Sequence, residues 1–220
     1  MTFQFDTEKF RENLLRWWKE NGRSFPWRNT RNSYHILVSE ILLHRTKADQ
    51  VVPVYNRFIE AFPTVRELAS AKSEDVKRLL RPLGLFWRNE LISRMAQEIV
   101  TRFHGEIPSA KEDLESLPGV SHYIAAAIRC FGRGDAEPLL DTNTVRIIGR
   151  VFGLRVTDAS RRNNRFRQLY HALIDSGHPR EFNYAMIDLG ALICIPKNPK
   201  CTVCPVNRHC TFGRGLCVGE

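Results

Sequence analysis

Residues 117–128 read LPGVSHYIAAAI, and the chain then continues through RCFGRGDAEPLL to Asp141. Pro118 and Gly119 end any helix that runs through residues 112–116, because neither residue suits a helix interior. The alanine-rich segment after them has the composition of a second, closely packed helix. The stretch therefore predicts a helix, a short hairpin and another helix. A turn of small residues at a helix N-terminus leaves backbone N–H groups open and is suited to holding a phosphate.

The remaining segments also indicate helices. No segment sustains the alternation of polar and apolar residues that is typical of strands. Thr64 with Glu67, and Ser109 with Glu112, each match the pattern of a capping box, which predicts a helix start at both places. Residues 90–103 form an amphipathic helix whose apolar side consists of Leu91, Ile92, Met95, Ile99 and Phe103. The sequence therefore predicts an all-α fold of ten or so short helices.

Composition narrows the classes of partner. The chain has 220 residues and a formal net charge of +9, and 25 of its 33 basic residues are arginine. Arginine suits bidentate phosphate contacts, so the excess charge modestly favours a nucleic-acid partner. No apolar run reaches 18 residues and no signal peptide is present, so we expect a soluble intracellular protein without a membrane partner.

Four of the six cysteines lie close together near the C-terminus. Cys194, Cys201, Cys204 and Cys210 have the spacing C-x6-C-x2-C-x5-C. In a reducing compartment such cysteines are metal ligands or free thiols more often than disulfides. Four thiolates fit a tetrahedral zinc or an iron–sulfur cluster, and the spacing alone does not choose between them.

These motifs together resemble one enzyme superfamily. Residues 117–120, Ala125, Ala126 and then Asp141 are similar to the helix–hairpin–helix motif of the endonuclease III and MutY superfamily of DNA glycosylases. There the catalytic aspartate follows the hairpin at about this distance. The cysteine spacing resembles the loop that holds a four-iron four-sulfur cluster in the same superfamily. The resemblance therefore implies a [4Fe-4S] cofactor rather than zinc.

Residues 26–46 resemble the N-terminal signature of the MutY branch, with Pro26-Trp27-Arg28, Tyr34 and Thr46 as matching positions. In that branch the residue at position 40 is the active-site acid, which implies a catalytic role for Glu40. The residue at position 45 enters the duplex near the base opposite the target. MutY proteins have Gln there, whereas the mismatch glycosylase MIG has Arg, as this chain does. The DNA-binding residues that the resemblance implies are Trp27, Arg28, Arg45, Leu85, Gly119, Ser121 and His122.

The resemblance also implies a two-lobed fold. Residues 28–134 would form a six-helix barrel domain that contains the helix–hairpin–helix. Residues 1–27 and 135–220 would form a second helical domain that carries the cluster loop, residues 194–210. The active site would lie in the cleft between them. No long extension follows Cys210, so we expect the separate domain by which MutY recognises oxidised guanine to be missing.

Position 123 separates the reaction types. Endonuclease III enzymes have Lys there, which forms a Schiff base and cleaves the strand. MutY enzymes usually have Ser, and MIG-type enzymes have Tyr, as here. Tyr123 cannot form a Schiff base, so we expect a glycosylase without lyase activity in which Tyr123 lines the base pocket. Ser121 replaces the last glycine of the family's hairpin, and its Cβ could perturb the turn.

Three functions remain. The favoured one is a base-excision-repair glycosylase that acts as a monomer in the cytoplasm, near the nucleoid. It flips thymine or uracil out of a mispair with guanine in double-stranded DNA and leaves an abasic site. The first alternative is a MutY-like adenine glycosylase acting on adenine opposite guanine or 8-oxoguanine. The second is a non-catalytic iron–sulfur DNA-binding protein, against which the presence of Asp141 argues. Asp141 precedes a helix, so a plain N-cap role is compatible with catalysis.

Overall fold

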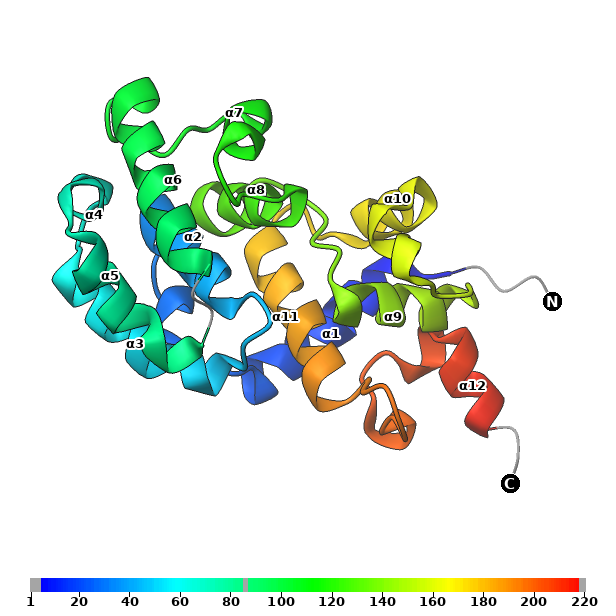
Figure 1. The fold of residues 1–220 in the computed structure, drawn as a ribbon. Coiled ribbons are helices and arrows are strands. Elements are labelled where there is room, and N and C mark those ends of the chain that lie inside the picture. Colours follow the sequence, from blue (N-terminus) through cyan, green and yellow to red (C-terminus); the bar gives the residue numbers. More distant parts are fainter. Residues whose placement is uncertain (1–4, 85–86, 218–220) are drawn as a thin grey trace. The chain divides into compact units, whose positions relative to one another are not determined.

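The computed structural model describes residues 5–84 and 87–217, which form helices and no strand (Figure 1). The all-α prediction is therefore confirmed. No described helix is both long and apolar enough to cross a membrane. The chain divides into two compact units. The central unit is Ser24–Arg133, and the terminal unit combines Met1–Arg23 with Gly134–Glu220.

The core of the central unit is built around helix α2 (Ser33–Leu43). This helix is apolar on most of its circumference and lies among other helices, as such helices must. Its buried side chains are Tyr34, Ile36, Leu37, Val38, Ser39, Ile41 and Leu42. Asn32 caps its N-terminus by accepting hydrogen bonds from the backbone N–H groups of Tyr34 and His35. Helices α3 (Ala48–Ala61) and α8 (His122–Ile128) pack against α2, and η1 (Pro26–Arg28) precedes it.

Three further helices complete this part of the central unit. Helices α4 (Val65–Ser70) and α5 (Ser73–Leu80) pack against α6 (Trp87–Phe103), and η2 (Arg81–Leu83) follows α5. The capping box of Thr64 and Glu67 is confirmed. The second predicted box, Ser109 with Glu112, is wrong. Helix α7 (Lys111–Ser116) begins one residue later than that pattern requires, so Ala110 occupies the N-cap and offers no side-chain oxygen.

The predicted hairpin lies between α7 and α8, and α8 continues into the π-helical segment η3 (Arg129–Arg133). Gly119 has φ 80°, a left-handed conformation that glycine adopts without strain. A Cβ at this position would lie 2.2 Å from Cδ2 of Leu91, so the packing also requires glycine. Ser121 has φ −79° and ψ 164°, an extended conformation open to any residue. The Cβ of Ser121 therefore does not strain the turn.

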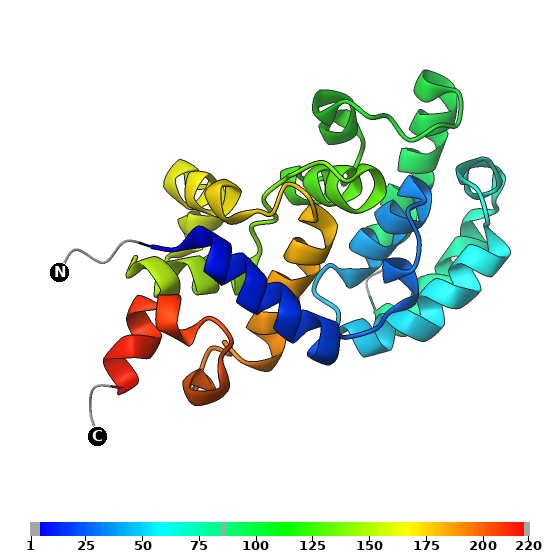
Figure 2. The ribbon, with the colours of Figure 1, turned by 180° about the vertical axis from the view of Figure 1, so that it is seen from behind.

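The terminal unit is organised around α11 (Pro179–Leu192), which packs against α1 (Thr7–Asn21) and α9 (Thr142–Phe152). Figure 2 shows α1 running across α11. Asp188 of α11 is fully buried and accepts hydrogen bonds from Trp18 Nε1 at 3.0 Å and Arg23 Nε at 2.7 Å. These bonds hold the end of α1 on α11. The remaining elements are η4 (Asp158–Arg162), α10 (Asn164–Leu173), η5 (Cys201–Val203), η6 (Asn207–His209) and α12 (Thr211–Cys217).

Candidate active site

Asp141 is the N-cap of α9, as the sequence predicted. Its Oδ1 accepts a hydrogen bond from the backbone N–H of Thr144 at 2.7 Å, and its own N–H donates to Thr144 Oγ1 at 2.8 Å. Its Oδ2 accepts from Asn143 Nδ2 at 3.3 Å. Both carboxylate oxygens are therefore acceptors, at the positive end of a helix dipole. A negative charge is stabilised at this end of a helix.

Within the terminal unit, a chain of polar contacts leads from Asp141 to the end of α11. Asn143 accepts a hydrogen bond at its Oδ1 from Arg146 Nη2 at 2.8 Å. The same guanidinium donates to the carbonyl of Gly190 at 2.8 Å and, through Nε, to the carbonyl of Cys194 at 2.7 Å. Gly190 allows this approach, because a Cβ there would lie 2.5 Å from the Cβ of Asn143. The orientation of the Asp141 carboxylate thus depends on the end of α11.

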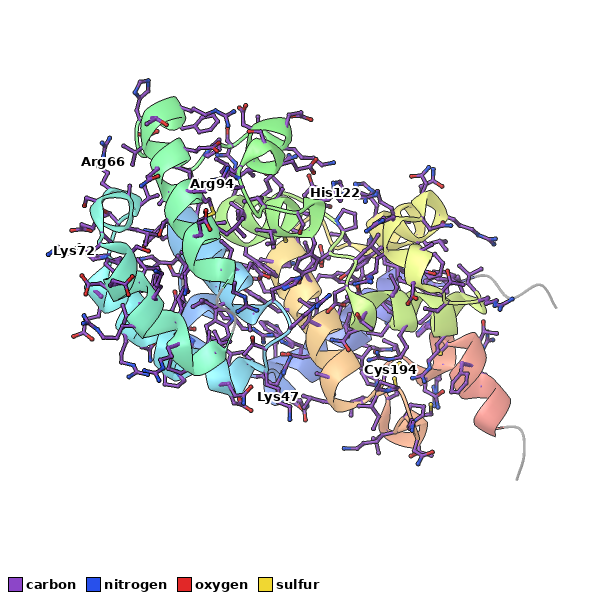
Figure 3. The ribbon with its side chains drawn as sticks, in the orientation of Figure 1. Lys47, Arg66, Lys72, Arg94, His122 and Cys194 are labelled. Atoms are coloured by element: carbon purple, nitrogen blue, oxygen red, sulfur yellow. The ribbon has the colours of Figure 1, made fainter. Side chains whose placement is uncertain are left out.

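The hairpin presents three of the predicted DNA-binding residues, Gly119, Ser121 and His122, on the central unit. Ser121 is the N-cap of α8 and accepts a hydrogen bond at Oγ from the backbone N–H of Ile124 at 3.3 Å. His122 Nδ1 lies 2.6 Å from Oε1 of Glu115 on α7, which ties the two helices of the hairpin together. Figure 3 labels His122 on α8. The DNA contacts of all three residues stay predictions.

Glu40 and Tyr123 also belong to the central unit. Glu40 is half-buried on α2, and Tyr123 is half-buried in the first turn of α8. Trp27 is a core residue: it is only 4% exposed, stacks on Phe25 at 5.0 Å and packs edge-on against Tyr55 at 5.4 Å. These ring contacts give Trp27 a packing role, and its DNA contact stays a prediction.

Two further predicted duplex-contacting residues, Arg28 at the end of η1 and Arg45 after α2, belong to the central unit. Arg28 is half-buried, with its guanidinium 5.2 Å from the centre of the Phe25 ring. Arg45 is exposed in the turn between α2 and α3 and has φ 59°, which is uncommon for a residue with a Cβ. Leu85 lies outside the described residues.

The four predicted metal ligands lie in the segment that follows α11, where Figure 3 labels Cys194. Arg150 of α9 donates hydrogen bonds to Cys194 Sγ at 3.3 Å and to the carbonyl of Ile195 at 2.8 Å. The backbone N–H of Gly213 donates to Cys210 Sγ at 3.4 Å. Donors aimed at sulfur atoms stabilise thiolates, which are the form that binds metals.

These motifs agree with the comparison to known proteins. Residues 38–171 match the family described as "HhH-GPD superfamily base excision DNA repair protein". The chain belongs to this superfamily. It is 37% identical over 215 residues to the "Thymine/uracil-DNA glycosylase" of Pyrobaculum aerophilum, covering 94% of this chain and 93% of that protein. It is 33% identical to the "Adenine DNA glycosylase" of Rattus norvegicus, covering 93% of this chain but 42% of that protein. The structure of a thermostable thymine-DNA glycosylase matches with a TM-score of 0.90 and 30% identity, over 95% of this chain and 97% of the other.

The cysteine loop of this HhH-GPD protein contains the four predicted metal ligands. Among the described residues, no three His, Cys, Asp or Glu side chains lie close enough to hold one metal ion. Cys204 nevertheless interacts electrostatically with Cys194, Cys201 and Cys210. Burial, and to a smaller extent the neighbouring cysteines, raise the pKa of the Cys204 thiol to about 12. Four thiolates held this close together need a positive charge between them, which a bound metal centre would supply.

Sequence reasoning did not identify Asn143, Arg146 or Arg150 as site residues. Their spacing contains a usable signal, because positions 143, 146 and 150 recur on one face of a helix that begins at the predicted catalytic residue. The partners that they bond to, carbonyls of residues 190–196, are more than 40 positions further along the chain. No pattern in the sequence predicts that contact.

Proposed function

We propose that this HhH-GPD protein is a monofunctional DNA glycosylase that removes thymine or uracil mispaired with guanine and leaves an abasic site. The observation that carries the proposal is the carboxylate of Asp141, held at a helix N-terminus with a donor on each oxygen. Its relative in Pyrobaculum aerophilum is named a thymine/uracil-DNA glycosylase and is similar over almost the full length of both chains, which supports the choice of base.

The chemistry follows from the charge of Asp141. When the bond between C1′ and the base breaks, its electron pair leaves with the base and the deoxyribose becomes cationic. An ionised carboxylate beside C1′ stabilises that cation, and water then adds to C1′. The capping bonds fix the orientation of the carboxylate before substrate binds. They therefore contribute to catalysis through preorganisation.

The leaving base needs stabilisation of its negative charge. Thymine and uracil depart as anions, so hydrogen bonds to their carbonyl oxygens suffice. Tyr123 offers a hydroxyl donor and a ring that can line the pocket for a flipped base. Because a phenol forms no Schiff base, the product is an abasic site in an intact strand. Glu40 has the role of orienting the base or the attacking water.

We propose that Cys194, Cys201, Cys204 and Cys210 hold a [4Fe-4S] cluster. When bound, this cluster ties together a segment with little regular structure and supplies a rigid loop. The segment exposes three basic side chains, Lys197, Lys200 and Arg208. Their positive charge would attract DNA phosphates. The partner is double-stranded DNA with a mispaired base, bound by a monomer in the cytoplasm.

An adenine glycosylase is the second candidate. Glu40 and the 33% identity to the rat adenine DNA glycosylase favour it. Adenine is a poor leaving group unless a ring nitrogen is protonated, so this reaction requires Glu40 to act as an acid. A purely structural iron–sulfur protein would not need a charged Asp141.

Labelled duplexes test the proposal directly. The purified protein is incubated under single-turnover conditions with strands that contain G·T, G·U, G·A or 8-oxoguanine·A pairs, and products are resolved with and without alkali. We expect cleavage of the thymine or uracil strand only after alkali. Activity confined to the two adenine duplexes would replace the proposal by the second candidate. No abasic product on any duplex would favour the non-catalytic reading.

A further inference from the structure

Arg88 is the largest of the almost completely buried side chains in the described part of the chain. It lies in the first turn of α6 and is 1% exposed. Burial lowers the pKa of its guanidinium to about 10. A cation that is removed from water costs free energy, so its contacts must recover that cost through hydrogen bonds. The groups that accept hydrogen bonds from Arg88 therefore indicate its structural role.

Arg88 bonds to residues on both sides of Arg45. Its Nη1 donates to the carbonyl of Leu42 at 2.8 Å, and its Nη2 donates toward Thr46 Oγ1 at 3.3 Å. Leu42 is in the last turn of α2, where carbonyls lack helical partners and a cation is favoured. Thr46 Oγ1 in turn lies 3.4 Å from the carbonyl of His44. Arg88 thus holds the two sides of this turn together through hydrogen bonds.

The turn that Arg88 supports has an unfavourable backbone. Arg45 is left-handed, with φ 59°, and its side chain is exposed. An L residue reaches this conformation at a cost, and such residues persist where the surrounding structure fixes them. The backbone N–H of Thr46 bonds to the carbonyl of Leu43 at 3.1 Å. The guanidinium of Arg88 adds two further hydrogen bonds to this turn, one to the carbonyl of Leu42 and one to Thr46 Oγ1.

We propose that Arg88 is the positioning residue for Arg45. Its guanidinium holds the end of α2 and Thr46 so that Arg45 is presented, before DNA binds, in the conformation that enters the duplex opposite the target. This inference rests on the proposed function and on the duplex-entering role that the sequence resemblance implies for Arg45. Without Arg88 the turn relaxes to a right-handed form, and only a fraction of molecules can bind the mismatch productively. The apparent affinity for the mismatch is then the intrinsic affinity multiplied by that fraction.

A double-mutant cycle between Arg88→Met and Arg45→Ala tests this directly. The affinity of each variant is measured for a duplex with G opposite an uncleavable 2′-fluoro thymidine, and for the same duplex fully paired. We expect Arg88→Met to weaken mismatch binding about tenfold, since the left-handed form is unfavourable by roughly that ratio, and to leave paired-duplex binding unchanged. In the Arg45→Ala background, Arg88→Met should have no further effect. Arg94→Met is the matched control, because Arg94 is exposed on the same helix (Figure 3).

The outcomes separate the hypotheses. The positioning role would be overturned if Arg88→Met left the mismatch affinity unchanged. It would also be overturned if the double variant lost mismatch affinity by the product of the two single-variant losses. If Arg88→Met lowers the melting temperature so far that it does not fold, Thr46→Val takes its place in the cycle. Thr46→Val removes one acceptor of Arg88 at a half-buried position and should show the same non-additivity with Arg45→Ala. A wild-type protein that does not distinguish the two duplexes would refute the proposed function instead.

Discussion

Asn143 donates a hydrogen bond from Nδ2 to Oδ2 of Asp141 at 3.3 Å, while its Oδ1 accepts from Arg146. A small amide thus connects the predicted catalytic carboxylate to a guanidinium that also bonds to the carbonyls of Gly190 and Cys194. One end of this chain is a residue that needs a fixed orientation for catalysis. The other end is the backbone of the first predicted cluster ligand. The two sites are therefore mechanically connected within the terminal unit.

Arg146→Met should slow base excision more than it weakens DNA binding. Removing the guanidinium frees Asn143 and lets the Asp141 carboxylate rotate, and small misplacements of a catalytic group cost on the order of tenfold to a hundredfold in rate. Single-turnover rates and duplex affinities measure the two effects. Arg155→Met is the control, since Arg155 is an exposed residue of the same unit. A variant with the wild-type rate would show that Asp141 keeps its orientation without this chain.

The purified protein should be brown and contain about four irons per chain, as a [4Fe-4S] cluster requires. Cys204→Ser should lose the iron and disorder the segment after α11, because ligation and folding are coupled. Cys130→Ala should retain the iron, because Cys130 is buried in η3 of the central unit. Metal analysis and visible absorption spectra measure the iron content of both variants. Stoichiometric zinc without iron in anaerobically purified protein would refute the cluster.

Tyr123→Lys tests the absence of lyase activity. The wild-type protein should yield broken strands only after alkali, and borohydride should not trap it on DNA, because a phenol forms no imine. The lysine variant gains trapping if its amine reaches C1′. Tyr123→Phe serves as the control for the ring without the hydroxyl. Efficient trapping of the wild-type protein would mean that another amine acts as nucleophile.

Glu40→Gln distinguishes the two candidate reactions. A thymine or uracil glycosylase releases an anionic base, so its excision rate should fall by on the order of tenfold or less. An adenine glycosylase would lose the acid that protonates the base, so its excision rate should fall nearly to zero. Excision rates are compared across pH 5 to 9 on G·U and 8-oxoguanine·A duplexes. Glu60→Gln, an exposed position on α3, controls for the loss of a charge. Abolished activity of Glu40→Gln on the G·U duplex would contradict the proposal that Glu40 only orients the base or the attacking water.

Helix boundaries were predictable wherever a local rule decides them. Pro118 and Gly119 separated α7 from α8, Thr64 capped α4, and Asp141 capped α9. The box at Ser109 was wrong because α7 begins at Lys111, which places Ala110 and not Ser109 at the N-cap. Local rules therefore gave the order of the helices and the position of the candidate catalytic carboxylate.

Features that depend on distant contacts were not predictable. Nothing in the sequence around Arg45 indicates φ 59°, since the constraint comes from Arg88, 43 positions away. Trp27 was predicted to contact DNA from a family signature, yet its ring is packed on Phe25 and Tyr55. An aromatic residue in a signature can be retained for core packing as well as for binding. The packing of Trp27 was therefore not predictable from the motif, and its DNA contact stays a prediction.

The central claim is that the charge of Asp141, and not only its capping, drives base excision. Asp141→Asn keeps an oxygen for the N–H of Thr144, so the loss of stability should be at most about 1 kcal/mol. Removing the charge should cost several kcal/mol in the transition state, a rate loss of roughly a hundredfold or more. Asp158→Asn, an exposed position of the terminal unit, is the matched control.

The decisive measurement is the single-turnover excision rate of Asp141→Asn on a G·U duplex, taken together with its melting temperature and its affinity for the same duplex. We predict a folded variant that binds the duplex like the wild type and excises uracil at least about a hundred times more slowly. Excision at the wild-type rate by that folded variant would contradict the claim and leave Asp141 as a helix cap alone.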